Sequence, residues 1–161
     1  MKHRVHAFQI VLTALLAISA SLFTACGSDD ADVGGGTPVT TTVNITLDEF
    51  SVIATPNSAP AGKVKFHVTN VGEDVHELVV LKTNLPPGMI PLNAEGDADE
   101  DAAGVANIGE KEDIASGASA DLELDLGAGK YVLICNLAMV EPDGSIEHHY
   151  AEGMYSGFTV Q

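Results

Sequence analysis

From about residue 41 onward, apolar and polar side chains alternate with a period of two, which is the pattern of half-buried β-strands. The clearest examples are residues 64–68 and 120–126. Residues 78–81 are apolar at every position, which predicts a central strand covered on both faces. No long amphipathic helical stripe follows the N-terminal segment. Seven or so short strands separated by turns therefore predict an all-β, Greek-key β-sandwich.

Two segments interrupt the strand pattern. Residues 43–47 and 50–54 both alternate, but their apolar positions have opposite parity, so we expect a bulge or bend across Asp48 and Glu49. Residues 84–113 carry a Pro-Pro-Gly turn and the acidic run 95–101. They are predicted to form a long acidic loop insertion, with at most a short helix, and such loops in compact domains tend to be functional or mobile.

The N-terminal segment has the features of an export signal. Lys2 and Arg4 precede a 16-residue apolar run, residues 8–23, which is short for a bilayer span and suited to a signal peptide. The sequence Leu-Phe-Thr-Ala before Cys26 resembles a bacterial lipoprotein signal, which implies cleavage before Cys26 and acylation of this cysteine. An uncleaved anchor and an ordinary secretory signal are the alternatives. All three place the domain outside the cytoplasm, in the cell envelope.

This interpretation divides the chain into three parts. Residues 1–25 are the predicted signal peptide, residues 26–42 a flexible Gly- and Asp-rich tether, and residues 43–161 the folded domain. The tether is expected to hold the domain close to the membrane to which the lipid attaches.

Charge and cysteine content exclude several classes of protein. The 161 residues include 23 acidic and 7 basic side chains, a net charge of -16. Removal of residues 1–25 would take away two basic residues and leave about -18. A nucleic-acid binder needs clustered Lys and Arg, so we expect no nucleic-acid partner. Two cysteines are too few for a disulfide scaffold or a Cys-rich zinc module.

Enzyme and calcium signatures are also weak. No Gly-x-Ser-x-Gly, P-loop or His-Glu-x-x-His motif occurs, so we expect no enzymatic activity. Asp97, Asp99 and Asp101 have the spacing of the first ligands of an EF-hand loop. Ala102 and Ile108 replace the glycine and glutamate that such a loop requires, which argues against calcium. The acidic run is expected either to be a solvated loop or to steer a basic partner.

One set of side chains carries metal chemistry. With Cys26 assigned to the anchor, Cys135 is the remaining cysteine, at the end of an apolar strand, and His149 and Met154 follow it. His76 comes directly after a turn. Thiolate sulfur with imidazole selects copper over hard cations. Two histidines and one cysteine in a plane with a weak axial methionine are the blue-copper arrangement, which passes single electrons.

Each member of this set has a plainer interpretation. A lone cysteine is most often a buried, inert thiol. His76 could be a surface histidine at the start of a strand. Met139 and Met89 compete with Met154, but their neighbours suggest packing or loop positions. His67 alternates with core residues and is expected to point outward.

The chain resembles the cupredoxin, or type 1 copper, family, especially bacterial plastocyanin/azurin-like and sulfocyanin-like domains. The resemblance implies a cupredoxin-like sandwich over residues 43–161, one type 1 copper ion, equatorial ligands His76, Cys135 and His149, and the axial ligand Met154. The His-Tyr-x-x-Gly-Met match selects His149 over His148. The matching stretches are residues 60–66, 70–72, 76–83, 129–136 and 149–155.

The sequence departs from the family pattern at two places. Thirteen residues separate Cys135 from His149, where the family usually has only a few. They contain Pro-Asp-Gly, so we expect a small excursion that leaves and returns without moving the ligands. Glu77 follows the first histidine, where several cupredoxins carry an asparagine that braces the ligand loop.

Three functions follow as hypotheses. The first is a monomeric, envelope-anchored carrier of single electrons whose redox partners present a basic docking patch. The second is copper trafficking, storage or sensing, which a flexible segment between Cys135 and His149 would favour. The third is a metal-free adhesive or structural lipoprotein.

Overall fold

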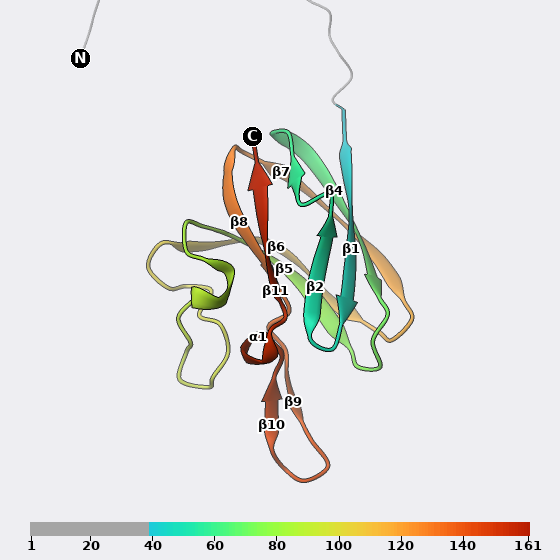
Figure 1. Ribbon diagram of the computed structural model, residues 1–161, viewed down its shortest axis with the longest axis vertical. Helices are drawn as coiled ribbons and strands as arrows, with labels where there is room; N and C mark the ends of the chain where they lie inside the picture. The colour runs from blue at the N-terminus through green and yellow to red at the C-terminus, as the bar shows by residue number, and fades with distance from the viewer. Residues whose placement is uncertain (1–38) are drawn as a thin grey trace, which may run out of the picture. The chain divides into compact units, whose positions relative to one another are not determined.

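The computed structural model describes residues 39–161, which fold as a sandwich of two β-sheets (Figure 1). The predicted signal peptide, Cys26 and most of the predicted tether lie outside the described residues. The first sheet has the strand order β2-β1-β4-β7. Its strands are β1 (Thr41–Asp48), β2 (Ser51–Thr55), β4 (Gly62–Asn70) and β7 (Ser119–Leu126). The strand β1 therefore begins two residues before the predicted start of the domain.

The second sheet has the order β3-β11-β8-β5-β6. Its strands are β3 (Ser58–Ala59), β5 (His76–Thr83), β6 (Val105–Ile114), β8 (Gly129–Ile134) and β11 (Tyr155–Val160). Three short elements lie outside both sheets' main body: the 3-10 turn η1 (Pro87–Met89), a hairpin of β9 (Ala138–Val140) and β10 (Ile146–His148), and the one-turn helix α1 (His149–Glu152). The predicted all-β sandwich is confirmed.

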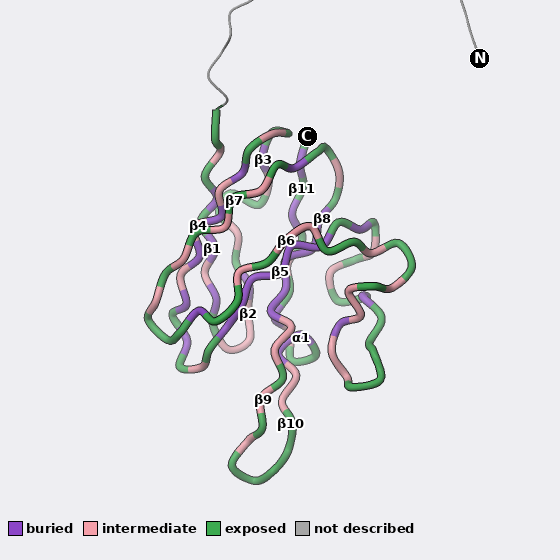
Figure 2. Tube along the Cα trace, turned by 180° about the vertical axis from the view of Figure 1, so that it is seen from behind, coloured by how far each residue is buried: buried purple, intermediate pink, exposed green. Residues whose placement is uncertain are grey.

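The two sheets enclose one hydrophobic core. Figure 2 shows in purple the buried stretches of chain that contribute to it. Inward positions of both sheets supply it, including Phe66, Leu78, Leu133 and Phe158. The rings of Phe66 and Phe158 meet edge to face, 5.4 Å apart. This packing follows directly from the period-two pattern, because alternate residues of each strand point to the same face.

The second sheet is covered on its outer face as well. Val79 and Ile134 lie on that face, and residues of the segment 84–104, notably Ile90 and Ala98, pack over them together with Tyr150. The hydroxyl of Tyr150 donates to the carbonyl of Pro87 at 2.9 Å and accepts from the N–H of Ile90 at 2.9 Å. The prediction that residues 78–81 form a central strand covered on both faces is therefore confirmed.

Two sequence-based expectations change with the structure. Where a bulge or bend was expected at Asp48 and Glu49, the chain makes a tight turn between two antiparallel strands, with Asp48 opposite Ser51. Residues 105–114 belong to strand β6, not to a loop. β6 pairs only with β5 and is the edge strand of its sheet, so all but one of its side chains retain some exposure and it lacks an apolar face.

The excursion predicted between Cys135 and His149 is confirmed as a hairpin. β9 and β10 pair antiparallel and project from the end of the sandwich at which α1 lies (Figure 1). The hairpin closes at its base, where the N–H of His149 donates to the carbonyl of Leu137 at 2.9 Å.

Within the described part of the chain, no helix combines the length and the apolar character that a membrane crossing demands.

Candidate metal centre

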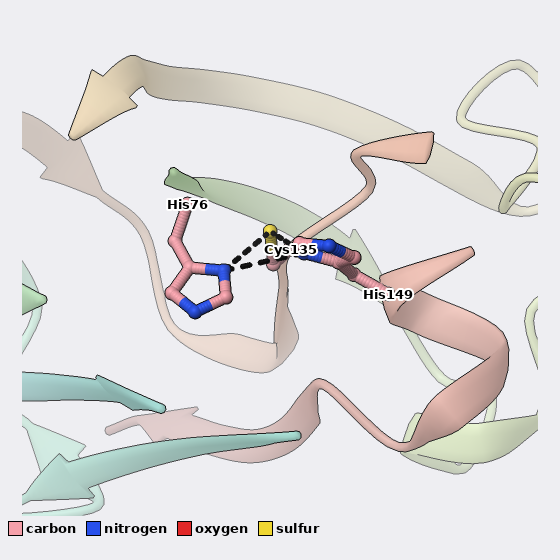
Figure 3. Close-up of side chains that lie close together, drawn as sticks. All are labelled: His76, Cys135 and His149. Atoms are coloured by element: carbon pink, nitrogen blue, oxygen red, sulfur yellow. Dashed lines mark hydrogen bonds between the residues drawn. The ribbon is translucent and has the colours of Figure 1, made fainter. Parts of the chain in front are cut away.

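Three predicted ligands meet at one end of the sandwich. His76 is the first residue of β5, Cys135 directly follows β8, and His149 is the first residue of α1. β5 and β8 are neighbours in the second sheet, and this pairing brings the start of one next to the end of the other. Figure 3 shows the Cys135 sulfur between the two imidazole rings, each of which presents its Nδ1 atom.

The spacing of these donor atoms fits a metal ion. The sulfur lies 3.4 Å from Nδ1 of His149 and 3.8 Å from Nδ1 of His76, and the two Nδ1 atoms are 3.2 Å apart. A point equidistant from the three atoms is about 2.0 Å from each. Bonds from protein ligands to a borderline metal ion are about 2.0–2.1 Å for histidine nitrogen and about 2.3 Å for thiolate sulfur. The triangle can therefore surround one ion in a trigonal plane with little adjustment.

All three donor side chains are fully buried. Burial is the main reason that the pKa of the Cys135 thiol is raised to about 11, although a hydrogen bond from the N–H of Glu77 opposes the shift. The thiol therefore keeps its proton at neutral pH in the absence of a cation. A metal ion would have to displace that proton, since the thiolate is the ligand form.

Glu77 supports the cysteine from two directions. Its N–H donates to the Cys135 sulfur at 3.4 Å, and its Oε1 accepts from the N–H of Asn136 at 3.0 Å. Burial and the nearby carboxylates of Glu100 and other acidic residues raise the pKa of Glu77 to about 7, against the effect of the Asn136 hydrogen bond. Glu77, at which the sequence departs from the family pattern, therefore holds Cys135 and the peptide bond after it in place.

Glu49 is a supporting residue that the sequence did not reveal. Its Oε1 accepts from Nε2 of His76 at 2.9 Å and from the N–H of Asp74 at 2.9 Å. Partial burial opposes ionisation, but hydrogen bonds from the main-chain N–H groups of Asp74 and Glu73 lower the pKa of Glu49. A carboxylate at Nε2 fixes the proton there, so the lone pair of His76 is on Nδ1, which faces the site. The only sequence signal was that Glu49 lies in the turn where the parity changes.

His149 is held differently. Phe50 packs against its ring with centroids 5.6 Å apart, and the ring of His76 lies 5.0 Å away. Burial, followed by the proximity of His76, lowers the pKa of His149. Its Nε2 is buried and has no hydrogen-bond partner among the described residues. The ring is therefore neutral and presents Nδ1 to the centre.

Met154 reaches the same place through the main chain. Its N–H donates to the carbonyl of His149 at 3.0 Å, and its carbonyl accepts from the N–H of Cys135 at 3.1 Å. Its side chain is fully buried in the core that also contains Cys135. Met139 lies in the hairpin and Met89 is 66% exposed, as expected for residues outside the centre.

The acidic run 95–101 lies beside the centre. Asn136, next to Cys135, accepts from the N–H of Ala98 and donates to the Ala98 carbonyl and to Oε1 of Glu100. Asp97 lies 2.7 Å from Nδ1 of His148. This contact ties the hairpin to the acidic run. His67 points outward as predicted and contacts Asp121 at 2.6 Å.

Comparison with known proteins identifies the fold. The sequence matches no protein-family model and no curated protein. The structure of rusticyanin from Thiobacillus ferrooxidans is similar over 76% of this chain and 80% of that chain, with 15% identity and a TM-score of 0.50. A rusticyanin variant structure overlaps 78% of this chain and 83% of its own, with 17% identity and a TM-score of 0.50. The chain has the cupredoxin fold.

A third similar structure is auracyanin A, a blue copper protein from Chloroflexus aurantiacus. It overlaps 76% of this chain and 100% of its own, with 17% identity and a TM-score of 0.47. Within this cupredoxin fold, the structure brings His76, Cys135 and His149 within ligand distance of one another. It places the main chain of Met154 against both His149 and Cys135.

Proposed function

We propose that this chain is a type 1 copper protein that carries single electrons in the bacterial cell envelope. The observation that carries the proposal is the buried triangle of one sulfur and two Nδ1 atoms, about 2.0 Å from a common centre. The proposed equatorial ligands are His76, Cys135 and His149, with Met154 as the axial ligand. One bound copper ion would supply a Cu(I)/Cu(II) couple.

The surrounding residues hold the donors in place in the absence of any ion. Glu49 fixes the ring of His76, Phe50 packs against His149, and the Glu77 N–H points at the sulfur. Donors that do not need to move between two oxidation states lower the reorganisation that accompanies electron transfer. Complete burial also keeps water from the site.

Burial of the ligands also supports a carrier over an enzyme. A substrate would need an open position next to the metal, and the three donor side chains have no exposed surface. Two surface cavities among residues 39–161, of about 470 and 490 Å³, are lined by other residues.

Electron self-exchange separates the carrier from the trafficking alternative. A carrier should exchange electrons rapidly and release Cu(I) slowly to a chelator, whereas a trafficking protein should do the reverse. The structure favours the carrier, because the hairpin between Cys135 and His149 is closed at Leu137 and tied to Asp97 through His148. The metal-free alternative would require that the protein bind less than one equivalent of copper.

The proposed location and partners rest on the sequence. Acylation of Cys26 would attach a monomeric domain to the membrane, and residues 26–42 would provide reach. The strong negative charge, including the run 95–101 beside the centre, would guide a redox protein with a basic docking patch. The association rate with such a partner should fall as the salt concentration rises.

A further inference from the structure

We infer that Asp74, Glu147 and Nε2 of His149 form a second metal site, for a borderline divalent cation of the zinc class. His149 would then bridge two metal ions, with Nδ1 toward the copper and Nε2 toward the second ion. The inference rests on the proposed function, because a copper ion on Nδ1 leaves Nε2 as the free donor of that ring.

The geometry of the three residues fits one ion. Asp74, Glu147 and His149 each offer a ligand atom, and these atoms lie within 4.8 Å of one another. Oε1 of Glu147 is 3.9 Å from Nε2 of His149, which is too long for a hydrogen bond. Two ligands of one metal ion, each bound at about 2.0–2.2 Å, are separated by roughly 3.3–4 Å.

The second observation is the buried nitrogen itself. Nε2 of His149 has no hydrogen-bond partner among residues 39–161, and the side chain has no exposed surface. An unpaired buried polar atom is destabilising and rare in folded proteins. Phe50 and His76 hold the ring, and Nδ1 already faces Cys135, so the ring cannot turn Nε2 to another partner.

Both carboxylates are positioned by their own elements. Asp74 lies in the turn before β5, where its N–H donates to Glu49 and its carbonyl accepts from the Asn70 side chain at 2.7 Å. Glu147 lies on β10, opposite Met139 in the hairpin. The inserted hairpin therefore supplies a ligand to this site that a short connection from Cys135 to His149 would not contain.

The surrounding charge favours a cation. Besides Asp74, the acidic residues Glu49, Glu141 and Glu152 lie near Glu147, and a divalent ion would reduce the repulsion among these carboxylates. One imidazole and two carboxylates with an open fourth position are a set that zinc accepts. Calcium prefers six or more oxygen ligands, so the imidazole argues against it. The ion would replace the proton of Nε2, which is released to solvent.

The test begins with the full mature chain loaded with Cu(II), to which Zn²⁺ alone is added before both metals are counted. We expect one zinc per protein with copper retained, and a shift of the visible copper band because the two ions share one ring. Glu147→Gln and Asp74→Asn should each weaken zinc binding by about tenfold or more and leave the copper band in place. Glu152→Gln removes the same charge from a nearby exposed residue and should bind zinc as the wild type does.

Four outcomes would overturn the inference. Zinc binding that is equal in the wild type and in Glu147→Gln would show adventitious surface ions only. Zinc that displaces copper would show that the two ions compete for the site formed by His76, Cys135 and His149. Absence of zinc binding with a normal copper band would mean that a water molecule satisfies Nε2, and the proposed function would stand. Absence of the copper band before zinc is added would refute the proposed function, and the second site would fall with it.

Discussion

The main-chain N–H of Glu77 donates to the sulfur of Cys135 at 3.4 Å, and the side chain of the same glutamate accepts from the N–H of Asn136 at 3.0 Å. One residue on β5 thus holds both the sulfur and the peptide bond that follows it. Glu77 is only 8% exposed, and its carboxyl group lies among other acidic residues. Its protonation should therefore influence the free energy of unfolding.

Glu77→Gln should change how the stability of the metal-free protein depends on pH. Burial raises the pKa of Glu77 from 4.5 to about 7 in the folded protein. The contribution of this group is therefore fully present below pH 4.5 and is lost as the pH rises through about 7. We expect the free energy of unfolding of the wild type to fall relative to that of the variant across this window.

Urea unfolding of both proteins at several pH values between 4.5 and 8 checks this prediction, because groups common to both proteins cancel in the difference. A difference that stays constant with pH would show that Glu77 titrates normally. A difference that grows in favour of the wild type as the pH rises would reverse the assigned sign.

Met154→Leu should keep one copper per protein and raise the reduction potential. Leucine has a similar volume and fills the buried position, but it offers no sulfur donor to the oxidised ion. Voltammetry of the copper-loaded variant measures the shift. Met139→Leu is the matched control and should leave the potential unchanged, since Met139 lies in the hairpin. Equal potentials in all three proteins would remove Met154 from the ligand set.

Replacement of residues 139–146 by a short turn should preserve the copper centre. The removed segment includes Val140 and Ile146, which are largely exposed, and the His149 N–H to Leu137 carbonyl bond that closes the hairpin remains. We expect a stability change of about 1 kcal/mol or less and an unchanged visible band. Loss of the band in a variant whose circular dichroism is native would show that the hairpin itself forms the site.

Cys26→Ser should release the domain from the membrane fraction or leave an uncleaved precursor, because serine lacks the sulfur to which the lipid would be attached. Fractionation with mass measurement of the wild type checks the prediction. Membrane attachment that is the same in both proteins, with no lipid on the wild type, would exclude the lipoprotein hypothesis and favour an uncleaved anchor.

The sequence predicted those features that depend on local pattern. Alternation placed the strands, and the spacing of Cys135, His149 and Met154 after an apolar strand indicated a soft-metal centre. The Pro-Asp-Gly turn within the insertion predicted an excursion that leaves and returns, since turn chemistry is local, and the structure shows this excursion to be a hairpin.

The features that the sequence did not predict depend on long-range contacts. Only Ile114 of the ten residues of the edge strand β6 is buried, so the sequence of this strand does not need an apolar face and the alternating pattern is missing. Glu49 contacts His76 across 27 residues of sequence, and the contact of His148 with Asp97 spans 51. Nothing in the local pattern of an acidic turn residue or of a histidine pair indicates such a partner.

The visible absorption spectrum of the Cu(II)-loaded chain distinguishes a type 1 copper site from other copper sites. We expect an intense thiolate-to-copper charge-transfer band with one copper per protein, and the loss of that band in Cys135→Ser. A well-folded wild-type protein that binds copper without such a band, or a Cys135→Ser variant that keeps it, would mean that Cys135 is not a ligand of a type 1 copper ion.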